Sequence, residues 1–98
     1  PVQPAAQISA GGFALVSGRV MSVNEAGGYL WLELDGPLVL RIGEDERKLF
    51  STGSPASWKG RQLEARGWVI DRRGQRGLKP GHKPFMLPLR HSAMLEFK

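Results

Sequence analysis

The sequence contains no cysteine, has no long apolar run and is poor in histidine. Without cysteine, disulfide frameworks, thiolate zinc sites and cysteine nucleophiles are all excluded. No apolar stretch approaches the ~18 residues that a membrane-spanning helix requires. We therefore expect one folded domain within the 98 residues, without a membrane span and with one modest hydrophobic core.

Residues that could perform catalysis are also scarce. His82 and His91 are the only histidines, and neither lies in a cluster of carboxylates, which a metal site or an acid-base pair would need. The three acids at 44–46 are adjacent, so on a helix they do not face one another. No serine lies in a G-x-S-x-G motif, and the glycines between residues 74 and 81 lack the spacing of nucleotide-binding loops. We expect no catalytic activity, no metal and no cofactor.

Positive charge, in contrast, is plentiful and unevenly distributed. The net charge is +5. Residues 1–43 hold two arginines against three acids, whereas residues 44–98 hold twelve cations against six acids. The densest stretch is DRRGQRGLKPGHKP at residues 71–84, which we call the basic loop. Such a patch favours an anionic partner, whether nucleic acid, anionic lipid or acidic polysaccharide.

The chain begins with PVQPAAQISAGG, which is rich in proline, alanine and glycine and has no hydrophobic period. We predict a flexible arm over residues 1–12 and an ordered domain over residues 13–98. The small residues before Gln7 are typical of the end of a cleaved export signal, and a cut in a longer chain explains the same start. Both a cytoplasmic and a periplasmic location therefore stay open.

Apolar alternation predicts three strands in the first half of the domain. FALVSGRVMSV at 13–23 indicates a long strand that bends or bulges at Gly18. YLWLEL at 29–34 and LVLRI at 38–42 alternate strictly and flank a D-G-P turn, which predicts a hairpin.

The second half begins with a predicted short helix at 43–50, where acids precede bases in the order that suits the helix macrodipole. A loop follows over 51–60, and we expect its Trp58, with Phe50 nearby and Phe85 further on, to lie in the core. RQLEARGWVI at 61–70 predicts a fourth strand that alternates. One side has Leu63, Ala65, Gly67 and Val69, and the other has Gln62, Glu64, Arg66 and Trp68.

The last predicted strand is FMLPLRHSAMLEF at 85–97, interrupted near Pro88 because proline cannot donate to a central ladder. Five short strands favour closure into a small all-β barrel, since closure removes exposed edges.

This order of elements resembles the OB fold, a five-stranded Greek-key barrel with a helix between its third and fourth strands. Several segments are similar to the OB domains that accompany staphylococcal-nuclease-like domains in bacterial proteins: GRV at 18–20, YLWLEL at 29–34, VLRI at 39–42, GRQLEARGWV at 60–69 and LRHSAMLEF at 89–97. The resemblance implies a nucleic-acid-binding accessory domain without the catalytic residues of the nuclease.

The face of the predicted hairpin is the first candidate site, because OB folds bind ligands on their second and third strands. Tyr29 and Trp31 point outward there with Arg41, so bases could stack on two rings beside a guanidinium. The alternative is that both rings cover the barrel or form a dimer contact, since aromatic residues are enriched at interfaces. Glu33 on the same face repels phosphate and counts against nucleic acid.

The fourth strand adds Arg66 and Trp68 to this candidate site, although Gly67 permits a bulge that would reverse the direction of Trp68. The basic loop is the second candidate site. Its cations would hold phosphates: Arg72, Arg73, Arg76, Lys79 and Lys83. The alternative for this segment is a flexible, solvated turn.

Together these features predict non-catalytic binding of single-stranded DNA or RNA with little sequence preference. A protein-interaction domain is the first alternative, contacting a partner protein or a second copy through the Tyr29 and Trp31 face. An oligosaccharide binder using the same face is the second.

Overall fold

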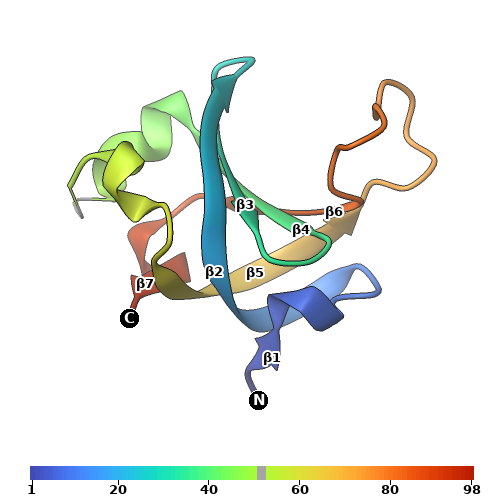
Figure 1. The fold of residues 1–98 in the computed structure, drawn as a ribbon, viewed down its shortest axis with the longest axis horizontal. Helices are drawn as coiled ribbons and strands as arrows, with labels where there is room; N and C mark the ends of the chain where they lie inside the picture. Colours follow the sequence, from blue (N-terminus) through green and yellow to red (C-terminus); the bar gives the residue numbers. More distant parts are fainter. Residues whose placement is uncertain (51–52) are drawn as a thin grey trace.

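The computed structural model describes residues 1–50 and 53–98. Its strands are β1 Gln3–Pro4, β2 Gly12–Ala26, β3 Tyr29–Leu34, β4 Leu38–Gly43, β5 Gln62–Asp71, β6 Phe85–Leu89 and β7 Leu95–Phe97. Four short 3-10 helices join them: η1 Ala5–Gln7, η2 Glu44–Leu49, η3 Pro55–Trp58 and η4 Ser92–Met94. The predicted all-β class is confirmed (Figure 1). Within these residues no helix has the length and apolar character to cross a membrane.

Five of the strands close into a barrel in the order β2-β3-β4-β6-β5, with β2 pairing back to β5. All pairs in this ring are antiparallel except β4 and β6, which run parallel from Leu38 beside Phe85 to Ile42 beside Leu89. One parallel pair between the third and fifth barrel strands fits the predicted OB-like topology.

The long strand β2 pairs with both of its neighbours in the barrel. Its first half pairs with β5 and its second half with β3, and the β3 register shifts between Val20 and Ser22. The bulge therefore lies around Met21 and not at the predicted Gly18. It reverses the side-chain alternation: Val16 and Val20 are buried before it, whereas Val23 packs on the core after it.

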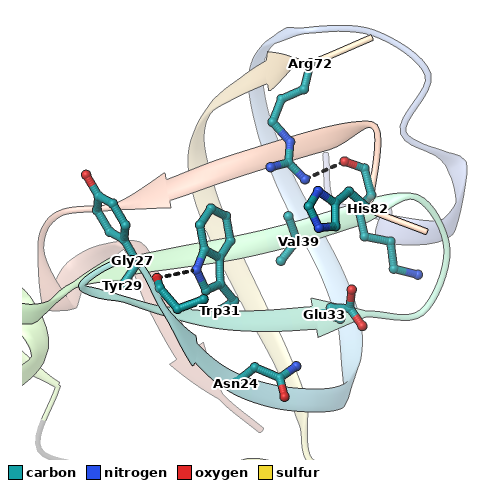
Figure 2. Close-up of a pocket in the computed structure, with 10 residues that line it drawn as sticks. Asn24, Gly27, Tyr29, Trp31, Glu33, Val39, Arg72 and His82 are labelled. Atoms are coloured by element: carbon teal, nitrogen blue, oxygen red, sulfur yellow. Dashed lines mark hydrogen bonds between the residues drawn. The ribbon is translucent and has the colours of Figure 1, made fainter. Parts of the chain in front are cut away.

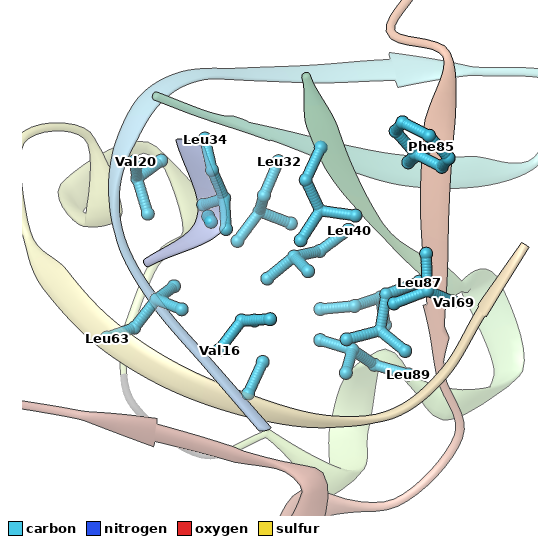
Figure 3. Packing of buried hydrophobic residues seen from close by; sticks show 14 of the residues in the cluster. Val16, Val20, Leu32, Leu34, Leu40, Leu63, Val69, Phe85, Leu87 and Leu89 are labelled. Atoms are coloured by element: carbon cyan, nitrogen blue, oxygen red, sulfur yellow. The ribbon is translucent and has the colours of Figure 1, made fainter. Parts of the chain in front are cut away.

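The core is filled by the inward residues of the alternating strands (Figure 3). Trp58, Phe50 and Phe85 are all buried in it, as predicted. The Trp58 ring lies 5.3 Å from that of Phe97. On β5 the inward residues are Leu63, Ala65 and Val69, which confirms the predicted alternation of that strand.

The helical segment differs from the prediction in its type. Residues 44–49 form a 3-10 helix, in which Glu46 Oε1 accepts the Gly43 N–H at 3.1 Å. Part of the predicted loop 51–60 is also helical, because Pro55 begins η3 and proline suits a first helical turn. Residues 51 and 52 lie outside the described residues.

The last predicted strand is divided at a different place. β6 continues through Pro88, and the chain leaves the barrel only after Leu89, to return as β7 beside β5. Pro88 is tolerated because the β5 ladder reaches only Phe85 and Met86. Among the described residues, that edge of β6 has no antiparallel partner beyond Met86 for proline to disrupt.

The first twelve residues are packed on the barrel, in contrast to the predicted flexible arm. β1 pairs with β2 in parallel, and Ala5 and Ile8 are buried in the core. Gly36, in the turn between β3 and β4, has a φ of 87° and lies against Ala6 so closely that a Cβ would collide with the Ala6 backbone.

This contact predicts a stability difference between two glycine substitutions. Gly60 has a nearly equal φ of 86° but no atom within 4 Å of an added Cβ, so Gly60→Ala should cost only the left-handed strain of about 1–2 kcal/mol. Gly36→Ala should cost about 1–3 kcal/mol more, from overpacking against Ala6. Urea unfolding of both variants measures the difference. Equal costs would contradict the docking of the first residues.

Candidate binding groove

The outer face of the β3–β4 hairpin carries the two predicted aromatic side chains. Tyr29 and Trp31 point out of the barrel from β3, with their ring centroids 5.8 Å apart in an edge-to-face arrangement. The Trp31 Nε1–H donates to the Ala26 carbonyl at 3.0 Å, which holds the indole in one orientation. Tyr29 is 36% exposed and Trp31 is half-buried. Both rings are therefore accessible in part.

Two guanidinium groups lie on these rings. Arg41, the cross-strand partner of Trp31, extends diagonally over Tyr29, with its Cζ 4.3 Å from the ring centroid. Arg72, at the start of the basic loop, lies over Trp31 at 5.7 Å. The face therefore combines flat apolar surface with positive charge, as cation–π contacts require.

The basic loop is built from successive turns. Backbone hydrogen bonds join Gln75 N–H to Arg72 O, Leu78 N–H to Gln75 O, and His82 N–H to Lys79 O. The third residue of each turn is a glycine with a φ between 81° and 90°. A type II turn needs a positive φ at this position, which glycine adopts most readily. The glycines of the loop thus serve its own folding.

The loop is also tied down on the hairpin. The Arg72 N–H donates to Pro84 O at 2.7 Å, the Arg72 guanidinium donates to the Lys83 carbonyl, and Lys83 Nζ donates to Gly36 O at 2.6 Å. Val39 points out of the barrel and yet is only 3% exposed, because this loop covers it. The two ends of the loop are therefore held on the hairpin, while most of its residues are exposed to solvent.

Between the hairpin and the loop lies a groove with a volume of about 450 Å³ (Figure 2). Trp31 and Val39 contribute its apolar surface. The remaining side chains that line it are mostly polar: Asn24, Tyr29, Glu33, Arg72, His82 and Lys83. Apolar surface with a few polar groups around it is the usual make-up of a ligand site.

Burial has an electrostatic effect on Arg72. It lowers the pKa of the guanidinium, and repulsion from Arg41 lowers that pKa further. An arginine stays charged at neutral pH all the same. Its Nε is buried and has no hydrogen-bond partner within residues 1–50 and 53–98. A ligand with negative charge in the groove would relieve the repulsion between the two arginines.

The other predicted cations divide into two groups. Arg73 turns back to Asp71 in a 2.8 Å ion pair, lies 5.0 Å from the Phe85 centroid, and holds the pKa of Asp71 below its ordinary value by hydrogen bonding. Arg76 and Lys79 are exposed near the tip of the basic loop. The loop therefore offers its tip cations and Lys83 more readily than Arg73.

Arg66 and Trp68 are not brought to the groove. They point outward from β5 beside β2, where Trp68 is 65% exposed and its cross-strand partner Phe13 is 69% exposed. Trp68 does face away from the core, so Gly67 does not reverse it. Alternation within a strand predicts which residues point out of the barrel. It does not predict which other strands those residues will lie beside after the barrel closes.

Six of the described residues that line the groove were not among the predicted site residues: Asn24, Ala26, Gly27, Glu33, Val39 and His82. Asn24 was missed because the bulge at Met21 brings Ser22 and Asn24 to the outer face beside Glu33 and Trp31. Glu33, Val39 and His82 had signals that could have found them: Glu33 and Val39 share the hairpin face with Trp31, and His82 belongs to the basic loop.

Comparison with known proteins adds no family to this geometry. No protein-family model matches the chain, and no curated protein is significantly similar to it. Across the described residues, no group of three or more histidine, aspartate or glutamate side chains is placed to hold a metal ion. The properties of the groove therefore have to be inferred from its own side chains.

The contacts of Arg72 predict that it stabilises the fold. Arg72→Ala removes the contact with Trp31 and the hydrogen bond to Lys83, and should lower the free energy of unfolding by about 1–2 kcal/mol. Arg76→Ala removes an equal side chain from the exposed tip and should stay within about 0.5 kcal/mol of the parent protein. Urea unfolding with tryptophan fluorescence compares the two. Equal stability of both variants would show that the loop is held without Arg72.

Proposed function

We propose that the chain is a non-catalytic module that binds single-stranded nucleic acid in the groove between the β3–β4 hairpin and the basic loop. One observation carries the proposal. Trp31, half-buried and fixed by its Nε1–H, has the Arg72 guanidinium over its ring in a groove bordered by the basic loop. Aromatic surface for bases beside cations for phosphates is the combination that sequence-tolerant single-strand binding uses.

The proposed division of labour follows the positions of the side chains. Bases stack on Trp31 and Tyr29, each stacked base contributing ~1–3 kcal/mol. Phosphates pass along Arg76, Lys79 and Lys83, which are spread over the basic loop and free of ion pairs with the acids of the described residues. Arg41 and Arg72, which lie over these rings in the structure, supply further positive charge beside the stacked bases.

Salt dependence tests the role of the loop cations. Binding of labelled single-stranded DNA and RNA 12-mers is measured by fluorescence anisotropy at several salt concentrations. If three phosphates are contacted, the logarithm of the association constant should fall with the logarithm of the salt concentration at a slope of about −2, since each phosphate contributes ~0.7. The double variant Arg76→Gln with Lys79→Gln should flatten this slope by about 1.4.

The matched control for this test is Lys48→Gln with Lys59→Gln. These lysines carry the same charge on or beside η2 and η3, which lie on the opposite side of the barrel from the basic loop (Figure 1). This pair should leave the slope nearly unchanged. An equal flattening by both pairs would assign the salt effect to net charge, and absence of binding at low salt would refute the proposal.

A tryptophan pair tests the role of the hairpin face. Trp31→Ala should weaken binding by about 5- to 100-fold, as expected for loss of one stacked base. Trp68→Ala removes the same side chain from the β5 face outside the groove and should leave affinity within about twofold. If Trp68→Ala weakened binding as much, the nucleic acid would have to contact the β5 face.

Protein interaction is a second candidate function, favoured by the exposed pair of Phe13 and Trp68. Two large apolar side chains side by side on an outer sheet face are typical of a protein contact. Sedimentation velocity over a range of concentrations tests self-association. A dimer lost in Trp68→Ala and kept in Trp31→Ala would locate the contact on β5, away from the groove.

A further inference from the structure

The two walls of the groove carry opposite hydrogen-bonding chemistry. On the β2–β3 side, Asn24 Nδ2 donates to Ser22 Oγ at 3.4 Å, and Ser22 Oγ donates to Glu33 Oε1 at 2.9 Å. These hydrogen bonds use the Ser22 hydroxyl hydrogen and one of the two amide hydrogens of Asn24, and they orient the carboxylate. An ionised carboxylate only accepts hydrogen bonds and has about four lone-pair sites, so Glu33 keeps capacity on both oxygens. The Glu33 carboxylate is therefore the main acceptor of this wall.

The opposite wall presents donors. It consists of Arg72, His82 and Lys83 of the basic loop. Lys83 Nζ donates one of its three hydrogens to Gly36 O, which leaves two for a ligand. In Figure 2, Glu33 lies below Val39 while Arg72 and His82 lie above it, with Trp31 beside them. A ligand lying on Trp31 would meet the Glu33 carboxylate along one edge and donors along the other.

The spacing of Trp31 and Glu33 along β3 suits a single nucleobase. Trp31 and Glu33 are two residues apart on one strand, so their Cα atoms are separated by about 7 Å along β3. A planar base stacked on the indole extends over such a distance toward the carboxylate.

The polarity of the groove distinguishes among the bases. Guanine alone places two adjacent kinds of donor, the N1–H and the N2 amino group, on the edge that a carboxylate can accept from with both oxygens. Its O6 and N7 are acceptors on the neighbouring edge, and arginine and lysine are their usual partners. Thymine and uracil present an N–H between two carbonyl oxygens, which a carboxylate repels. Adenine and cytosine present a single amino group beside an acceptor nitrogen.

We propose that the groove holds one guanine base, stacked on Trp31, with Glu33 accepting from its N1–H and N2 amino groups and the basic loop donating to O6 or N7. This inference rests on the proposed function and refines it. Phosphate contacts tolerate any sequence, and one base position favours guanine. It also gives a role to Glu33, the one acid that lines the groove.

A set of 12-mers with a single variable base tests the inference. Four strands are titrated by fluorescence anisotropy: oligothymidylate, and the same strand with one central guanine, adenine or cytosine. Quadruplexes cannot form because each strand has at most one guanine. The guanine strand should bind about 5- to 100-fold more tightly than oligothymidylate, the range of discrimination by one bidentate contact. Adenine and cytosine should lie between the two.

The variant Glu33→Gln tests the proposed contact itself. Because the amide replaces one acceptor oxygen with a donor, the ratio of guanine to thymine affinity should fall to within about twofold of one. Glu25→Gln removes the same charge from an exposed carboxylate paired with Arg47 outside the groove, and should keep the guanine preference. Thermal unfolding of both variants verifies that they are folded.

The outcomes separate this inference from the function on which it rests. Equal binding of all four strands by the parent protein, or a preference that survives Glu33→Gln, would overturn the guanine site and leave single-strand binding intact. Absence of binding to every strand at low salt would overturn both.

Discussion

The parallel pairing of β4 with β6 is the constraint on which the rest of the site depends. It places Phe85 beside Leu38, and the Phe85 N–H donates to Pro37 O at 3.1 Å. The chain must therefore enter β6 at the end of the hairpin where its turn lies. The basic loop, which precedes β6, therefore lies across that end of the hairpin, where Lys83 Nζ donates to Gly36 O. Parallel neighbours always require such a crossover connection.

This arrangement makes the loop both a structural cover and a part of the proposed binding surface. Its turns, its backbone hydrogen bonds and the burial of Val39 account for its position without any ligand. The positive charge of Arg72 is not balanced in the same way, because Arg72 and Arg41 repel each other across the aromatic pair. A rigid position with unbalanced positive charge is a form of preorganisation for an anionic ligand, and this combination makes the groove a better candidate than the β5 face.

Much of the fold could be predicted because side chains in strands alternate with a period of two. That rule identified the hairpin, the inward residues of β5 and the outward direction of Tyr29 and Trp31. It failed where tertiary contacts interrupt the period or override local preference. The bulge at Met21 exchanged the two faces of β2, Pro88 was accommodated beyond the reach of the β5 ladder, and residues 1–12 found a surface on which to pack. A local pattern holds no information on such distant partners.

The sequence by itself determined the class of fold, the core and the concentration of cations in one loop, because hydrophobic period, turn residues and charge are local properties. Only the tertiary structure decided which of these charges and rings meet. Arg72 lies on Trp31 and Glu33 lines the groove, whereas Arg73 pairs with Asp71 and Trp68 lies on another face. The physical reason is closure: when a sheet closes into a barrel, residues that share an outward direction are distributed around its circumference, and strand pairing alone decides which become neighbours.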